Sequence, residues 1–196
     1  MNSIVVLLAL FALTKAQTPT PCESPKQWEA KYFAFERGSV REEAGSITYD
    51  EVGERVRFVV KDERDGHVVD AYEVIMLFGE KNVEYRYDYE TKQCTQRPNQ
   101  YPFRPIGVPP NAVALGDGYI GASGDPGAGM LVSSFFEIPR IGERYEVIVT
   151  AGACIPVTDV FTRLEGGRVE ERLTDFYDIV APYPNATVFS PPAACL

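Results

Sequence analysis

Histidine and cysteine are scarce in this chain, which has one histidine and four cysteines among 196 residues. A serine-hydrolase triad would need His67 as its base, and His67 follows an Asp-Gly pair that is typical of an exposed hairpin tip. The sequence has no Gly-x-Ser-x-Gly segment, and no Cys-x-x-Cys pair offers a zinc site. Carboxylates remain available for acid–base chemistry, but nothing singles out two of them. We therefore expect that the protein is not an enzyme.

Basic residues are outnumbered, because 19 lysines and arginines stand against 28 aspartates and glutamates, for a formal net charge of -9. Nucleic acids and anionic membrane surfaces are both bound by clustered positive charge. We therefore expect no nucleic-acid partner.

Long hydrophobic runs are missing apart from one apolar stretch at residues 4–13, which is followed by Thr14-Lys15-Ala16. This stretch is too short to span a bilayer, and small residues follow it where a signal peptidase cleaves. The pattern predicts a signal peptide at residues 1–16 and a secreted, extracellular protein without a transmembrane segment. The remaining residues, 17–196, are enough for one domain with a sizeable core.

The cysteines, although few, are even in number: Cys22, Cys94, Cys154 and Cys195. In an oxidising compartment, an even set predicts structural disulfides. Four cysteines allow three pairings, and their spacing does not choose among them.

Alternating side chains dominate what is present. Residues 83–90 place valine and tyrosines on one face and charged residues on the other, and residues 54–61 and 144–150 repeat this period of two. Six further segments have strand character: residues 28–37, 45–50, 72–78, 130–138, 157–164 and 169–180. Sixteen glycines and fifteen prolines mark short turns between them. We predict an all-β fold of about nine antiparallel strands.

Two stretches interrupt the alternation and are predicted to be loops. Residues 93–110 are rich in proline and residues 116–129 are rich in glycine, so neither can form a central strand. Such loops are often functional, although residues 93–110 would equally serve as a rigid crossing from one sheet to another. Residues 116–121 match the Gly-x-Gly-x-x-Gly nucleotide-binding pattern, but no helix can open after them, so we interpret them as a glycine-rich turn.

Acidic residues in the glycine-rich stretch are candidates for calcium binding. Asp117 and Asp125 would combine carboxylate oxygens with loop carbonyls, which are the ligands that Ca²⁺ takes in extracellular proteins. A solvated acidic loop is the alternative interpretation. Asn185-Ala186-Thr187 is a glycosylation sequon, and the prolines around it favour an exposed position.

Taken in order along the chain, short motifs resemble the ependymin family. They are the Cys-x-x-Pro-x-x-Trp segment at residues 22–28, Tyr49-Asp50 before residues 55–57, residues 72–78 before residues 83–85, and residues 91–94, 108–112, 119–121, 154–157, 176–179 and 188–192 with Cys195. The resemblance covers nearly the whole chain after the signal peptide. The chain departs from some vertebrate members by lacking a third cysteine pair and by having Asn111-Ala112-Val113 where those members carry a sequon.

The resemblance implies a secreted, often glycosylated and calcium-associated homodimer. It implies a fold of two stacked, curved antiparallel sheets, a half-open barrel or sandwich similar to bacterial lipoprotein carriers, that encloses a hydrophobic pocket. It also implies that Cys22 pairs with Cys154 and that Cys94 pairs with Cys195.

Two function classes follow from these features. The first is a carrier of a hydrophobic or lipid-like small molecule, and the alternative is an extracellular-matrix or cell-adhesion protein that binds its partner in a calcium-dependent way. For the carrier, the resemblance implies a pocket, and strand alternation predicts that its lining is a subset of Phe58, Leu77, Tyr85, Tyr87, Phe135, Val147, Phe161 and Phe176. A filled core would use the same residues.

Overall fold

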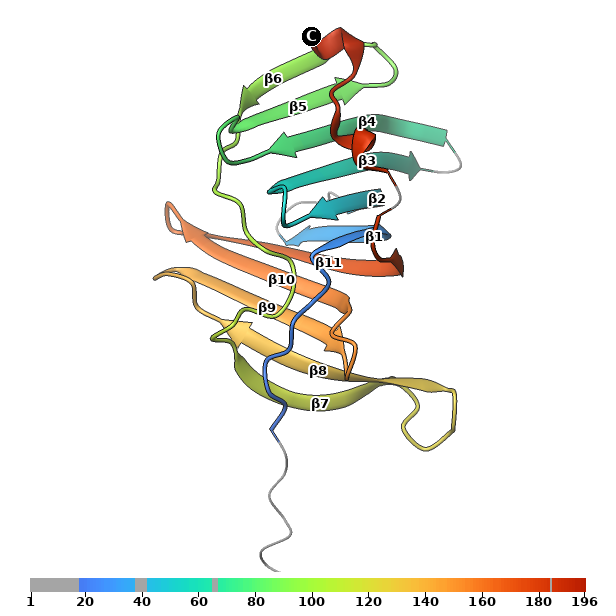
Figure 1. The fold of residues 1–196 in the computed structure, drawn as a ribbon, viewed down its shortest axis with the longest axis vertical. Coiled ribbons are helices and arrows are strands. Elements are labelled where there is room, and N and C mark those ends of the chain that lie inside the picture. The colour runs from blue at the N-terminus through green and yellow to red at the C-terminus, as the bar shows by residue number, and fades with distance from the viewer. Residues whose placement is uncertain (1–17, 38–41, 65–66, 184) are drawn as a thin grey trace, which may run out of the picture.

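Eleven antiparallel strands form one continuous sheet in the computed structural model, which describes residues 18–37, 42–64, 67–183 and 185–196 (Figure 1). The strands are β1 (Gln27–Arg37), β2 (Glu42–Asp50), β3 (Arg55–Arg64), β4 (His67–Leu77), β5 (Val83–Asp88), β6 (Cys94–Pro98), β7 (Val113–Gly121), β8 (Gly129–Glu137), β9 (Glu143–Thr150), β10 (Pro156–Glu165) and β11 (Arg168–Val180). Two short 3₁₀ turns, η1 (Ala186–Phe189) and η2 (Ala193–Cys195), follow. The predicted signal peptide lies outside the described residues.

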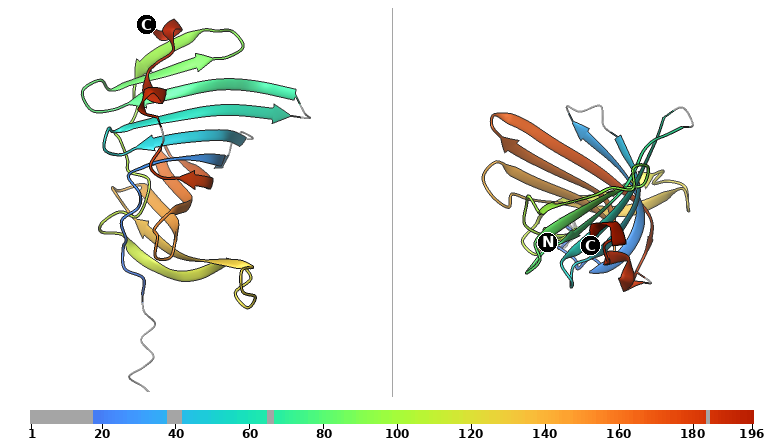
Figure 2. Two further views of the ribbon diagram at one scale, coloured as in Figure 1. Left: turned by 45° about the vertical axis from the view of Figure 1, so that its right-hand side comes forward. Right: turned by 90° about the horizontal axis from the view of Figure 1, so that it is seen from above.

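The sheet is built from two meanders that meet in its middle. Its order is β6-β5-β4-β3-β2-β1-β11-β10-β9-β8-β7, so the first six strands and the last five each follow the chain, and the pairing of β1 with β11 joins them. Figure 2 shows that the sheet is strongly twisted and curved. The all-β, half-open architecture is confirmed. Strands that we expected to divide between two sheets are hydrogen-bonded into one.

All nine expected strands are present, and the two additional strands are the edges of the sheet. β6 lies within the proline-rich stretch and β7 includes the first six residues of the glycine-rich stretch, so the prediction that these stretches are entirely loops is wrong. Residues 116–121 belong to β7 and form a strand, not a turn. The physical reason is that an edge strand pairs on one side only and therefore tolerates proline and glycine, which a central strand does not. The expected crossing is also present, because residues 99–112 connect the two edges (Figure 1).

Aromatic side chains gather on one face of the sheet, which we call the aromatic face. The strand registers place Tyr32 beside Phe176, Trp28 beside Tyr49, and Phe161 beside Tyr145 on this face. A first cluster packs around Trp28 and Tyr49, whose side chains are fully buried, and a second packs around Phe135, Tyr145 and Val147. Both clusters thus lie in one layer of side chains beneath the segments that cross this face.

Each disulfide fastens one end of the chain to the sheet, on opposite faces. Cys22 bonds to Cys154 and ties the N-terminal segment to the β9–β10 turn, while Cys94 bonds to Cys195 and ties the C-terminus to edge strand β6. The pairing implied by the family resemblance is confirmed. Among the described residues, no cysteine is free.

A hydrogen-bonded carboxylate holds the C-terminal segment against the other face of the sheet. Asp50 is 1% exposed and accepts hydrogen bonds from the side chains of Gln27, Arg55 and Tyr183 and from the Gly53 amide. Burial opposes its charge, but these bonds outweigh burial and lower the pKa of Asp50. The C-terminal segment thus covers this face, whereas residues 18–26 and 99–112 pack on the aromatic face.

Candidate functional site

An apolar cleft of about 640 Å³ opens where the two covering segments meet on the aromatic face. We call it the proline cleft. Its lining is Pro21, Cys22, Glu23, Ser24, Lys26, Glu51, Arg104, Pro105, Ile106, Gly107, Val108, Pro109, Pro110, Glu137, Pro139 and Tyr145. Small-molecule sites in proteins have volumes of about 300–1,000 Å³ and mostly apolar walls with a few polar groups. The proline cleft has both properties.

Residues 104–110 of the crossing segment form one wall of the proline cleft, and side chains hold them in place where strand pairing is absent. The amide of Ile106 donates to the Tyr49 hydroxyl at 3.1 Å, and the amide of Gly107 donates to the Tyr145 hydroxyl at 3.2 Å. The next amide, that of Val108, donates to Ser24 Oγ at 3.3 Å. Prolines before and after this run have no amide hydrogen to satisfy, so the segment can cross the sheet without a neighbouring strand.

Gly107 sets how closely the two covering segments approach. Its φ of +145° is rare for residues with a side chain, and a Cβ atom there would lie 2.6 Å from Ser24 Cβ. Ser24 Oγ is also 3.5 Å from the sulfur of Cys154, next to the disulfide. A glycine at residue 107 is therefore required for the cleft to close on this side.

The second cluster forms the floor beneath the cleft. Phe135 and Val147, both predicted pocket residues, are 1% exposed in this cluster, and the predicted Phe161 packs against it. Tyr145, Cys22 and Val108 belong both to the cleft lining and to this cluster or its edge. Three of the eight predicted residues thus support the proline cleft from below.

Arg104 is the cationic group most closely built into the cleft. Its guanidinium lies 4.4 Å above the Tyr145 ring and 4.0 Å above the Phe161 ring. Its Nη1 atom is buried and has no hydrogen-bond partner among the described residues. Arg104 interacts electrostatically with the buried carboxyl group of Asp159. Burial raises the pKa of Asp159, while the charge of Arg104 and the hydroxyl of Thr174 partly offset this increase.

Other charged side chains of the proline cleft have partners in the structure. Lys26 pairs with Glu23 at 2.9 Å, and Glu51 accepts a hydrogen bond from Tyr49. The Lys26–Glu23 pair is exposed to solvent, whereas Tyr49 is buried in the first cluster. Glu137 also contributes a carboxylate to the lining.

A second cleft of about 820 Å³ adjoins the first across Arg104, and we call it the arginine cleft. Its apolar surface comes from Tyr101, Phe161 and Val169. Its charged lining comprises four arginines and three glutamates: Arg37, Arg163, Arg168, Arg172, Glu36, Glu170 and Glu171. The guanidinium of Arg163 lies 3.7 Å above the Tyr101 ring and ion-pairs with Glu143 at 3.0 Å. Arg172 likewise ion-pairs with Glu36 and Glu43, and Arg37 with Glu171, so carboxylates balance three of the four arginines.

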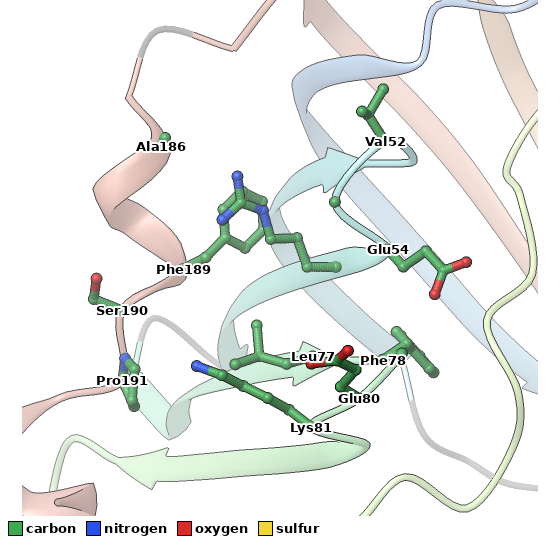
Figure 3. Close-up of a pocket in the computed structure, with 13 residues that line it drawn as sticks. Val52, Glu54, Leu77, Phe78, Glu80, Lys81, Ala186, Phe189, Ser190 and Pro191 are labelled. Atoms are coloured by element: carbon green, nitrogen blue, oxygen red, sulfur yellow. The ribbon is translucent and has the colours of Figure 1, made fainter.

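The remaining predicted pocket residues lie elsewhere. Phe58 and Phe176 belong to or pack against the first cluster on the aromatic face. The strand registers place Tyr85 and Tyr87 on the opposite face, with Leu77. Leu77 lines a cleft of about 520 Å³, where Figure 3 shows it facing Phe189 among charged side chains. No single pocket among the described residues brings all eight together.

Calcium binding stays a prediction. Asp117 lies on β7 and accepts a hydrogen bond from Ser133 Oγ at 2.7 Å, whereas Asp125 lies in the β7–β8 connection. Among the described residues, no three His, Cys, Asp or Glu side chains converge as metal ligands.

The sequon is exposed, as the sequence predicts. Asn185 Oδ1 accepts hydrogen bonds from the amide and hydroxyl of Thr187, and the side chain of Asn185 is open to solvent. Attachment of a glycan at Asn185 remains a prediction.

Sequence reasoning missed the proline cleft itself. The prolines of residues 102–110 signalled a rigid crossing, but nothing in the sequence places that crossing against residues 21–26. Tyr145 carried a usable signal, because it shares the alternation of Val147 and Val149. Its hydroxyl, which anchors the crossing, is visible only in the structure.

Comparisons with known proteins complete the description. A family model described as Ependymin matches residues 68–195. The protein named mammalian ependymin-related protein 1 of Mus musculus is 30% identical over 195 residues, covering 97% of this chain and 83% of the relative. Among solved structures, an uncharacterized conserved protein from Thermus thermophilus is similar with a TM-score of 0.49 at 12% identity, covering 97% of both chains. A LolA superfamily protein from Nitrosomonas europaea has a TM-score of 0.36 at 11% identity, covering 93% of this chain and 97% of that one.

Proposed function

The chain belongs to the ependymin family, and from this membership and the proline cleft we propose that it is a secreted, non-enzymatic protein that binds an apolar or lipid-like small molecule. The cleft is the observation that carries the proposal. Five prolines, Ile106 and Val108 supply apolar wall, and the exposed Lys26–Glu23 pair is among its charged groups. Among the described residues, no helix has the length and apolar character needed to cross a membrane.

Physical reasons favour the cleft as a ligand site over a packing defect. An apolar cleft of this size on a protein surface leaves hydrophobic area in contact with water, and a ligand that covers it gains about 25 cal/mol per Å². The cleft is also prebuilt, because the disulfide Cys22–Cys154 and the hydroxyls of Tyr49 and Tyr145 fix its walls. Prebuilt walls reduce the entropy lost on binding.

Binding of Nile red, an uncharged apolar fluorophore, tests the proposal. We expect saturable binding to the secreted protein and weaker binding to Pro105→Trp, which places an indole at an exposed position of the cleft lining. Pro102→Trp is the matched control, since Pro102 is exposed on the same crossing segment but does not line the proline cleft. The wild-type protein and this control should bind equally.

Two results would contradict the proposal. One is the absence of saturable Nile red binding to folded wild-type protein. The other is equal loss of affinity in both tryptophan variants, which would place the bound probe outside the proline cleft.

A further inference from the structure

Four aliphatic side chains project into solvent from two turns at one edge of the sheet. They are Ile138 and Ile141 in the β8–β9 turn, and Leu164 and Val169 beside the β10–β11 turn. Ile141 is fully exposed, and the other three side chains are between 56% and 61% exposed. Single exposed aliphatic residues are ordinary on protein surfaces, whereas a contiguous group of them marks an interaction site. We call this group the aliphatic rim.

The aliphatic rim is contiguous because β9 and β10 are paired. The Leu164 amide donates to the Gly142 carbonyl at 2.7 Å, so Leu164 adjoins the residue that follows Ile141. The register of β10 with β11 places Val169 directly across from Leu164. Figure 1 shows both turns projecting from the same side of the sheet. The four side chains therefore belong to one surface.

The size and shape of the aliphatic rim fit a lipid bilayer better than a protein partner. A stable protein interface buries roughly 800 Å² on each partner, contributed by about 20–30 residues, and its two surfaces are complementary in shape. Four side chains on protruding turns supply neither the area nor a complementary surface. A bilayer requires no fixed shape, because the hydrophobic effect is non-directional and the boundary between headgroups and acyl chains accepts each apolar side chain separately.

The charges beside the aliphatic rim are balanced, which favours a zwitterionic bilayer over an anionic one. Arg140 lies between the two isoleucines and pairs with Glu143 at 2.6 Å, and Arg163 pairs with the same carboxylate at 3.0 Å. Arg168 precedes the glutamates at residues 170–171. The formal net charge of -9 also opposes an anionic surface. Long arginine side chains can reach the headgroups while their aliphatic neighbours insert.

We propose that the aliphatic rim docks the protein on the surface of a zwitterionic lipid bilayer. The rim adjoins the proposed ligand site, because Pro139, which lies between the two isoleucines, lines the proline cleft. A docked molecule therefore holds this cleft next to the lipid. Docking itself does not rest on the proposed function, since none of the four rim side chains lines the proline cleft.

Flotation with vesicles of phosphatidylcholine tests the proposal. The full secreted chain should float with the vesicles at millimolar lipid, equally at about 0.05 M and about 0.5 M NaCl, because salt screens charge interactions and not apolar contacts. The double variant Ile138→Asn/Ile141→Asn should lower the partition coefficient roughly tenfold or more, since burial of one such side chain already accounts for about that factor. Its melting temperature should match that of the wild type, because both residues are exposed.

Val52→Asn is the matched control. Val52 is 71% exposed in the β2–β3 turn, which the alternating strand directions place at the opposite edge of the sheet. This variant should partition as the wild type does. An environment-sensitive NBD fluorophore adds a readout of position: on Ile141→Cys its fluorescence should increase with vesicles, and on Val52→Cys it should not change.

Three results would overturn the proposal: no flotation of the wild type, a partition that falls with salt, or equal partition of the wild type and the double variant. A double variant that alters the oligomeric state in light scattering, with unchanged vesicle partition, would assign the aliphatic rim to contacts with a second copy. Nile red affinity without vesicles judges the proposed function separately and should be the same in the double variant and the wild type. Intact flotation without Nile red binding would contradict the proposed function and leave docking in place.

Discussion

Replacement of Tyr145 by phenylalanine should loosen the wall of the proline cleft. The Tyr145 side chain is 2% exposed, and its hydroxyl accepts the hydrogen bond of the buried Gly107 amide at 3.2 Å. The substitution keeps the ring that packs in the second cluster and removes only the acceptor. The Gly107 amide is then left buried and unsatisfied.

An unsatisfied buried donor costs about 1–3 kcal/mol of unfolding free energy. For a chain of this size, each kcal/mol lowers the melting temperature by about 2–4 °C, so the expected decrease is roughly 2–12 °C. Chemical denaturation with urea gives the free energy, and amide hydrogen exchange reports the Gly107 position directly. Exchange at Gly107 should accelerate, and Nile red affinity should decrease because the wall is less fixed.

Tyr177→Phe is the matched control for this change. Tyr177 lies on central strand β11 and is 52% exposed, so the same chemical substitution should alter stability by less than about 0.5 kcal/mol. If Tyr145→Phe also stays within this limit, with unchanged exchange at Gly107, the hydroxyl does not anchor the crossing segment and our description of the wall is wrong.

Three further predictions concern calcium, pH and assembly. If calcium binds the folded protein, excess Ca²⁺ should raise the melting temperature above that in EGTA, and identical melting temperatures would count against calcium binding. Because burial raises the pKa of Asp159, its contribution to stability is present below the ordinary value of 3.8 and is lost as the pH rises through the folded value. Asp159→Asn should therefore be more stable than wild type in urea at pH 7, with an advantage that fades on acidification, and a variant less stable at every pH would contradict this. We expect a homodimer in light scattering, with Tyr119→Arg on edge strand β7 shifting it toward monomer, because edge strands with exposed apolar residues are sites of association. A wild-type monomer at micromolar concentration would refute it.

Much of the fold was predictable from side-chain alternation. The period of two in residues 83–90 gave strand β5, which ends two residues earlier at Asp88, and the alternation around Val147 gave β9. The edge strands were missed because their prolines and glycines break the alternation. An edge strand tolerates these residues because it pairs with a neighbour on one side only. The disulfide pairing followed from the family resemblance and not from spacing.

The site was less predictable, for a physical reason. Strand alternation assigns a residue to a face, as it did for Phe135, Val147 and Phe161, but it does not say what covers that face. The proline cleft depends on contacts between residues 21–26, residues 104–110 and Tyr145, which are far apart in sequence. The hydrogen bonds of the Gly107 amide and the Ser24 hydroxyl help to close the cleft, and no sequence pattern at these two residues predicts them.

Photolabelling with a long-chain alcohol that carries a diazirine on its alkyl chain tests the central claim most directly. The probe is uncharged, so ion pairs with side chains of the cleft do not determine where it binds. After irradiation and peptide mapping, the account predicts labels on residues 21–26 and 104–110, and their loss when excess dodecanol competes. Labels confined to residues 52–55, 77–81 and 186–191, which line the cleft of Figure 3, would contradict the account, as would unspecific labelling that dodecanol does not reduce.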